Sequence, residues 1–210
     1  MLEYGIGITG GIAVGKSSVS KIIQQYQFQI IDADSISHQI LEECKDLIIQ
    51  KFGEKIITNN TINRRILGEI VFQDKKKRGI LESILHPKIR ERILESAQKL
   101  DQKKYPYFLD IPLFFESGGR SEYPVKFILC ISCLSEQQIQ RLMSRNHLTK
   151  DQALLRIKTQ MPLEEKCKRS DFIIQNDKSL KELHLCVLNF LKKIASIYKI
   201  SYPNFEKSLP

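Results

Sequence analysis

Apolar residues along the chain follow two kinds of pattern. Short apolar runs predict buried strands at residues 4–9, 28–34, 107–115, 126–133 and 171–176. Between these runs apolar residues return at helical spacing, as Val19, Ile22 and Ile23 do after the first run. Strands that alternate with helices are typical of a parallel sheet covered on both faces. The pattern therefore predicts a three-layer α/β fold.

The helical stretch from about 35 to 104 is too long for a single crossover between two strands. We expect an inserted helical region there, whose last helix begins at Pro87, because proline suits the first helical position. The remainder, about 1–34, 105–134 and 166–200, would form the core of a single domain spanning residues 1–210.

Capping boxes predict two more helix starts, at Ser135 with Gln138 and at Thr149 with Gln152. These helices, over about 135–165, would lie between two strands and could act as a mobile lid. A final amphipathic helix is expected over about 178–197, followed by an irregular tail at 201–210.

Composition narrows the classes of function. The 210 residues hold no apolar run of about eighteen residues, as a membrane span needs, and the N-terminus lacks a secretory signal, so we expect a cytoplasmic protein without a membrane partner. The net charge of +9 fits nucleic acid or small polyanions. The basic run at 74–78 has no interleaved aromatic residues, which disfavours nucleic acid. The five cysteines are expected to be reduced core thiols, because the only CxxC, Cys130 with Cys133, lies in a predicted strand.

Two glycine fingerprints overlap near the N-terminus. Gly5, Gly7 and Gly10 match a dinucleotide-binding turn, whereas Gly10, Gly15 and Lys16, followed by serine, match a phosphate loop. A dinucleotide turn would leave the apolar run at 4–9 inside a loop. The phosphate-loop interpretation places strand, loop and helix in the required order, with Lys16 able to reach the β- and γ-phosphates and Ser17 able to bind magnesium. We therefore expect a P-loop NTPase fold, with Gly5 and Gly7 packed in a central strand.

Carboxylates follow two of the predicted strands. Asp32 and Asp34 would share one face at the carboxyl end of the second strand, where ligands of open α/β folds bind. One could accept a proton from an attacking hydroxyl, although either could instead cap a helix. Asp110 ends the next strand and is a candidate magnesium ligand together with Ser17.

Two arginines mark the predicted lid. Arg141 and Arg145 are four residues apart and share a helical face. They could bring positive charge to a triphosphate in the transition state, or they could simply be solvated.

Several segments together resemble the dephospho-coenzyme A kinase family, in the family's order from Ile8 to about Asn176. They are ITGGIAVGKS, IIDADSISH, INRRILGEIVF with LESILHPKIR, DIPLFFE, and LTKDQALLRIKTQMPLEEKCKRSDFIIQN. The resemblance implies transfer of the ATP γ-phosphoryl group, with Mg²⁺, to the ribose 3′-hydroxyl of dephospho-coenzyme A.

The resemblance also implies roles for individual residues. ATP would be held by Gly11, Ile12, Ala13, Val14, Gly15, Lys16, Ser17 and Ser18. The acceptor would be held by Thr9, Asp32, Asp34, Arg64, His86 and Pro112. Asp34 would be the base or orient the acceptor, with Lys16, Arg141 and Arg145 supplying charge.

Three positions depart from the family pattern. The family usually has glycine where Ala13 stands and serine where Val14 stands, and it commonly has arginine where His38 stands. Ala13 could restrict the conformation of the phosphate loop, and His38 replaces a fixed positive charge expected near the acceptor.

Other functions stay open at this stage. Another P-loop small-molecule or nucleotide kinase would keep the loop and lid but change the acceptor. A GTP-dependent switch should carry an N-K-x-D sequence, which the chain lacks. An NAD-binding module requires a different first strand. The choice of base between Asp32 and Asp34 and the oligomeric state are left open.

Overall fold

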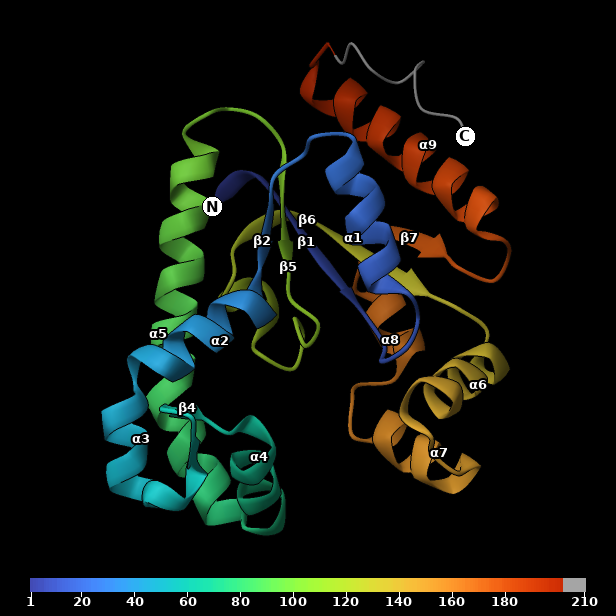
Figure 1. The fold of residues 1–210 in the computed structure, drawn as a ribbon. Coiled ribbons are helices and arrows are strands. Elements are labelled where there is room, and N and C mark those ends of the chain that lie inside the picture. The colour runs from blue at the N-terminus through green and yellow to red at the C-terminus, as the bar shows by residue number, and fades with distance from the viewer. Residues whose placement is uncertain (202–210) are drawn as a thin grey trace. The chain divides into compact units, whose positions relative to one another are not determined.

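The computed structural model describes residues 1–201, so the predicted irregular tail, apart from Ser201, lies outside the described residues. Strand β1 (Leu2–Gly10) lies in the middle of a five-stranded sheet of order β2-β5-β1-β6-β7 (Figure 1). It pairs in parallel with β5 (Tyr107–Asp110) and with β6 (Val125–Ser132). Strand β7 (Phe172–Gln175) continues the parallel pairing beyond β6, and β2 (Ile30–Asp32) is the other edge.

Close packing explains the glycines of β1. A Cβ atom at Gly7 would lie 3.1 Å from the ring of Phe114, and one at Gly5 would lie 3.1 Å from the hydroxyl of Tyr107. Both distances are tighter than ordinary van der Waals contact. The prediction that these glycines pack in a central strand is confirmed.

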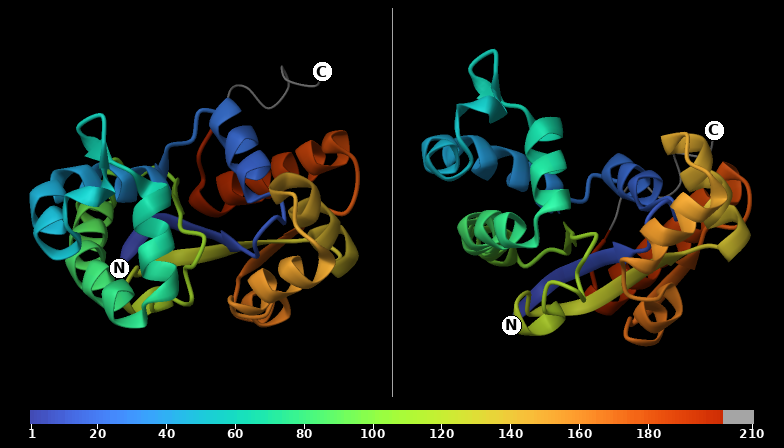
Figure 2. Two further views of the ribbon diagram at one scale, coloured as in Figure 1. Left: turned by 60° about the horizontal axis from the view of Figure 1, so that its bottom comes forward. Right: turned by 90° about the horizontal axis from the view of Figure 1, so that it is seen from below.

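Helices cover both faces of the sheet. Helices α1 (Lys16–Gln25) and α9 (Leu180–Tyr198) pack against one another on one face, and α8 (Leu163–Lys168) packs on β1 and β6 from the other (Figures 1 and 2). Buried side chains of the sheet, α1 and α9 form the main core, which includes Ile6, Ile8, Val19, Ile23, Phe108, Leu129, Val187 and Leu191. The predicted parallel sheet between helical layers is confirmed.

The two helix starts predicted from capping boxes differ in outcome. Helix α7 (Lys150–Lys158) begins at a complete capping box of Thr149 and Gln152, as predicted. Helix α6 (Ser135–Asn146) has Leu134 at its N-cap, and no side chain caps it there, so the box expected at Ser135 and Gln138 is wrong. The carboxylate of Asp177 accepts the Leu134 N–H at 2.7 Å. A carboxylate from a distant part of the chain thus accepts the backbone N–H of the N-cap residue, a hydrogen bond that the capping box was expected to make.

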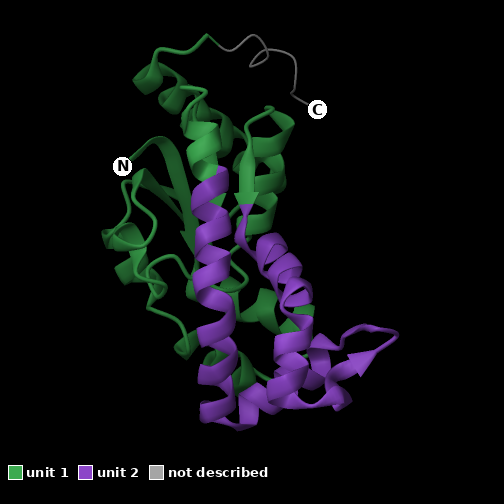
Figure 3. Cartoon of the chain, turned by 90° about the vertical axis from the view of Figure 1, so that its left-hand side faces the viewer, with its two compact units in different colours: residues 1–31, 97–210 green, residues 32–96 purple. Residues whose placement is uncertain are grey.

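The chain divides into two compact units (Figure 3). One comprises residues 1–31 together with the chain from residue 97 onward, and it contains the sheet. The other comprises residues 32–96. The boundaries of the inserted region expected from the sequence, 35–104, stay a prediction.

The unit of residues 32–96 is built mainly from helices, and every element here was expected to be helical. The elements in order are α2 (Ala33–Glu43), α3 (Lys45–Phe52), a 3-10 turn (Glu54–Ile56), β3 (Ile57–Thr58), β4 (Thr61–Ile62), α4 (Arg64–Gln73) and most of α5 (Lys75–Asp101). A separate core holds them together, including Ile40, Leu41, Ile48, Phe52, Ile56, Ile62, Leu67 and Leu85. The unexpected hairpin turns at Asn59 and Asn60, both at positive φ, which asparagine tolerates. Two-residue strands are too short to show a period in the sequence.

Helix α5 begins twelve residues before the predicted position, at Lys75 instead of Pro87, so that prediction is wrong. The carboxylate of Asp74 accepts the N–H groups of Lys76 and Lys77, at 2.9 and 3.1 Å, and so satisfies the first turn. Pro87 lies inside the helix, where its missing N–H removes one helical hydrogen bond. Across residues 1–201, no helix combines the length and apolar character needed to cross a membrane.

Candidate active site

The loop between β1 and α1 carries the predicted phosphate-binding motif. Gly15 forms the N-cap of α1 with a φ of 94°, in the left-handed region that favours glycine. A Cβ atom at this position would also collide with the side-chain amide of Asn176. The loop therefore depends on glycine here for two reasons, its backbone angle and its tight contact.

Lys16 and Asp110 form an ion pair beside this loop. Lys16 is the first residue of α1, and Asp110 is the last residue of β5, the strand next to β1. The other carboxylate oxygen of Asp110 accepts the hydroxyl of Ser20 at 2.8 Å. Asp110 is 7% exposed, so the pair is little screened by solvent. Asp110 thus fixes the ammonium group of Lys16 at the mouth of the loop.

Residues after β6 contact the loop from outside. Gln138 of α6 donates to the carbonyl of Ile12 at 2.9 Å, and Gln160, just after α7, accepts the N–H of Ile12 at 2.9 Å. Asn176, which follows β7, donates to the carbonyl of Val14 at 2.9 Å. The peptide groups of the loop are therefore held by three side-chain amides.

The two arginines predicted for the lid differ in surroundings. Arg141 is half-buried and donates to the carbonyl of Asn176 at 2.8 Å and to that of Val14 at 3.5 Å. Arg145 is exposed, and its Nε donates to Asn146 at 3.0 Å. The structure therefore brings Arg141, but not Arg145, into hydrogen-bond contact with the phosphate loop.

Thr9 and Pro112 lie together at the ends of β1 and β5. The buried hydroxyl of Thr9 donates to the carbonyl of Pro112 at 3.1 Å. The same carbonyl lies 3.5 Å from the ammonium group of Lys166. Both predicted residues are therefore part of the framework beside the loop.

Asp32 and Asp34 do not share a strand face, because β2 ends at Asp32 and Asp34 lies in the first turn of α2. The expectation of a shared strand face was wrong, because Asp32 takes the alternative role of a helix cap. Asp32 is the N-cap, and its carboxylate accepts the N–H of Asp34 at 2.9 Å and that of Ser35 at 3.3 Å. Asp34 is exposed and keeps its carboxylate available.

Arg64 and His38 are hydrogen-bonded within the same unit. The guanidinium group of Arg64, at the start of α4, donates to Nε2 of His38 on α2. An arginine from another helix therefore contacts the position where the family commonly has arginine. His86 is exposed on α5, directly before Pro87.

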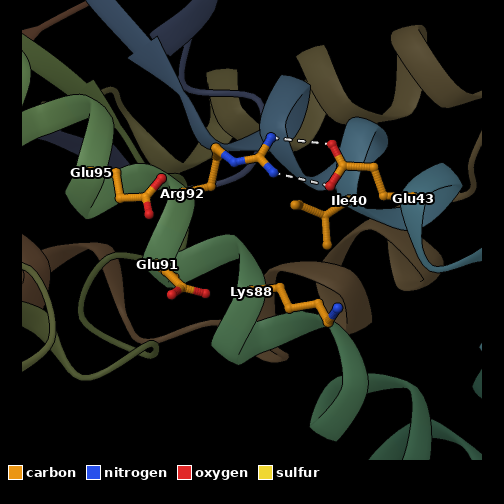
Figure 4. A pocket seen from close by; sticks show the side chains of 6 residues that line it. All are labelled: Ile40, Glu43, Lys88, Glu91, Arg92 and Glu95. Atoms are coloured by element: carbon orange, nitrogen blue, oxygen red, sulfur yellow. Dashed lines mark hydrogen bonds and ion pairs between the residues drawn. The ribbon is translucent and has the colours of Figure 1, made fainter.

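A pocket of about 210 Å³ opens between α2 and α5 in the unit of residues 32–96 (Figure 4). It is lined by Ile40, Glu43, Lys88, Glu91, Arg92 and Glu95. Glu43 accepts two hydrogen bonds from Arg92, at 3.2 and 3.0 Å, and thereby raises the pKa of Arg92. None of the predicted acceptor-binding residues lines this pocket.

The five cysteines are free thiols, but not all of them lie in the core as expected, because Cys186 is exposed. Burial raises the pKa of both Cys130 and Cys133, which favours the thiol over the thiolate that metals bind. The sulfur of Cys130 lies 3.7 Å from that of Cys167 on α8. In the part of the chain that the structure describes, no three His, Cys, Asp or Glu side chains gather as a metal site.

The departure at Ala13 has a measurable consequence. Its φ of 61° lies in the left-handed region, which costs an L-residue about 1–2 kcal/mol. Ala13→Gly should relieve this strain and lose about 0.4–1 kcal/mol through a more flexible unfolded chain. We expect a net gain of about 0.5–1 kcal/mol, seen as a rise in Tm of about 1–4 °C.

The control for this prediction is Ala33→Gly, at the first position of α2, which should lower the Tm because glycine weakens helices. An equal fall in Tm for both variants would contradict the assignment of strain to Ala13.

Sequence reasoning missed four residues that organise the loop. Gln138 was interpreted as part of a capping box, and Gln160, Asn176 and Lys166 were given no contact with the loop. One signal was present for Gln138 and Lys166, because both are polar residues at positions of their helices that face inward. Their partners in the loop, Ile12 and Gly10, are more than a hundred residues away in the chain.

Both the sequence and the fold of this chain are similar to those of known proteins. Residues 4–182 match the family model described as Dephospho-CoA kinase. A Dephospho-CoA kinase of Helicobacter hepaticus is 46% identical over 183 residues, covering 87% of this chain and 88% of the relative. One of Helicobacter pylori is 44% identical over 194 residues, covering 92% and 99%.

A solved structure, Dephospho-CoA kinase from Campylobacter jejuni, is 37% identical with a TM-score of 0.75, covering 92% of this chain and 98% of that one. The likeness thus extends over most of the chain. By sequence and by fold, this chain belongs to the dephospho-CoA kinase family.

Proposed function

We propose that this kinase transfers the γ-phosphoryl group of ATP to the ribose 3′-hydroxyl of dephospho-coenzyme A, giving coenzyme A. The observation that carries phosphoryl transfer is the glycine-shaped loop at the N-terminus of α1, with Lys16 held beside it by Asp110. The family match over residues 4–182 supports the acceptor. A net charge of +9 suits two polyphosphate substrates.

The ATP phosphates would be bound by the loop and the first turn of α1. The residues are Gly11, Ile12, Ala13, Val14, Gly15, Lys16, Ser17 and Ser18. Backbone N–H groups and the partial positive charge of the helix N-terminus favour bound anions. Lys16 would neutralise charge on the transferred group, and Arg141, already beside Val14, would add to it. Arg145 would join if the lid helices close.

The residues beside the loop fit a magnesium ion. Ser17 offers an exposed hydroxyl, and Asp110 offers a carboxylate with acceptor capacity beyond its bonds to Lys16 and Ser20. Magnesium prefers oxygen ligands, keeps several waters, and needs only one or two protein oxygens beside substrate phosphates. When bound, it would neutralise phosphate charge in the transition state.

The acceptor would be bound by Thr9, Asp32, Asp34, Arg64, His86 and Pro112. Asp34 would accept the proton of the ribose hydroxyl, because its carboxylate is exposed whereas that of Asp32 is engaged with two backbone N–H groups. Arg64, with His38, would offer hydrogen bonds and charge to acceptor phosphate.

The proposal is tested by ADP formation from MgATP with dephospho-coenzyme A, adenosine or AMP as acceptor. We expect turnover with dephospho-coenzyme A alone, and a product phosphorylated at the ribose 3′-hydroxyl by NMR. Turnover with adenosine or AMP alone would contradict the acceptor while keeping a P-loop kinase. Tight ATP binding without turnover on any acceptor would contradict phosphoryl transfer.

A further inference from the structure

Lys166 of α8 has a buried ammonium group. Its side chain is 0% exposed, and its Nζ lies 2.8 Å from the carboxylate of Glu116, 3.2 Å from the carbonyl of Gly10 and 3.5 Å from the carbonyl of Pro112. Three acceptors thus surround a group with three N–H donors. The charge is paired and its hydrogen bonds are satisfied.

Stability alone does not explain a charge at this position. Helix α8 packs on β1 and β6, where an apolar side chain would fit the layer. Removing an ammonium and a carboxylate group from water costs several kcal/mol for each ion, and apolar replacements of buried pairs are often neutral or stabilising. Lys166 must therefore be explained by what its contacts hold in place.

The contacts of Lys166 and Glu116 join three segments of the site. Gly10 ends β1 and begins the phosphate loop. Pro112 follows Asp110, the partner of Lys16, by two residues. The carboxylate of Glu116 also accepts the N–H of Met161 at 3.0 Å, where the chain leaves α7 and Gln160 contacts Ile12. One ion pair therefore connects the loop, the Asp110 segment and the exit from the lid helices.

We propose that Lys166 and Glu116 are positioning residues for phosphoryl transfer. The ammonium group fixes the carbonyls of Gly10 and Pro112 with respect to each other, and so fixes the loop and the Lys16–Asp110 pair. Through Glu116 it also fixes the base of the lid at Met161. Neither residue needs to touch a substrate. The inference rests on the proposed function, since its effect is read in the kinase reaction.

The test measures Tm and kcat for Lys166→Met, Glu116→Gln and the double variant. It separates the loss of stability caused by an unpaired charge from the loss of activity caused by a displaced site. Lys166→Met leaves Glu116 unpaired, and that side chain is only 23% exposed, so both Tm and kcat should fall. The double variant removes the unpaired charge and should recover most of the Tm. Its kcat should stay about 10- to 100-fold below wild type, because small misplacements of reacting groups are costly, while KM for both substrates changes less than kcat. Lys166→Arg should recover part of kcat.

Lys168→Met is the matched control, because Lys168 is on the same helix and its ion pair with Glu164 is exposed. Its kcat and Tm should stay near wild type. A double variant with wild-type Tm and wild-type kcat would overturn the proposal and leave Lys166 a structural residue. If Lys166→Met fails to fold, the double variant decides, since it leaves no unpaired charge and its kcat should stay low at a recovered Tm. An inactive wild-type enzyme would instead count against the proposed function.

Discussion

Lys16→Met should lower kcat by about 10³-fold, because a preorganised charge aimed at the transferred phosphoryl group is lost. That fall corresponds to about 4 kcal/mol of transition-state stabilisation. The protein should stay folded with a lower Tm, because the buried carboxylate of Asp110 loses its partner. The structure favours a large effect, since Asp110 fixes the Lys16 ammonium group at the mouth of the loop and little solvent reaches the pair. The measurement is kcat from ADP release at saturating MgATP and acceptor, with ATP affinity measured by calorimetry.

Lys21→Met is the control for this prediction. Lys21 lies on the same helix, α1, and is exposed, so kcat should stay within about twofold of wild type, as for most surface changes. A Lys16→Met enzyme within tenfold of wild-type kcat would show that phosphate charge is neutralised by other groups.

Asp34→Asn is expected to reduce kcat by about 10²- to 10⁴-fold, the range over which a general base contributes. Asparagine has the same shape but cannot accept the proton, and the backbone N–H at this position can still bond to Asp32. The Kd for ATP should not change, because the residue is assigned to the acceptor. Single-turnover rates with dephospho-coenzyme A separate this chemical step from product release.

Two further variants sharpen the result. Asp46→Asn, in the first turn of α3, changes an exposed carboxylate in the same kind of helical position and should leave kcat unchanged. Asp32→Asn should keep the N-cap and the Tm, because asparagine caps helices about as well as aspartate, and it should have a smaller effect on kcat. If Asp32→Asn loses more kcat than Asp34→Asn, then Asp32 is the base.

The sequence predicted the phosphate loop well because its signals are local. Glycine spacing, Lys16 and the apolar runs on either side are read within twenty residues, and β1, the loop and α1 appear in that order. The parallel sheet followed from the same alternation of patterns. The resemblance to a kinase family, carried by segments spread over most of the chain, agreed with the family found by comparison.

Other features depend on partners far apart in the chain and were missed or misplaced. The sequence at Ser135 fits a capping box, but at that helix start the carboxylate of Asp177 accepts the N–H of Leu134. The side chain of Gln138 donates to the carbonyl of Ile12 instead. Asp32 and Asp34 were placed on one strand because no local rule fixes where a strand yields to a helix. The sequence pattern alone does not show whether Asp32 caps the next helix or continues the strand.

The hydrogen bonds of Gln138 and Gln160 to Ile12 also determine how the phosphate loop responds to pH and salt. Side-chain amides carry no charge, so neither a change of pH between 5 and 9 nor added salt alters these two hydrogen bonds directly, whereas both alter exposed ion pairs. The contacts of these two glutamines with the phosphate loop therefore do not depend on ionic conditions. Sensitivity to salt or acid in the reaction would then arise from charged groups, such as the Lys166–Glu116 pair and the residues that bind the substrates, and not from these two hydrogen bonds.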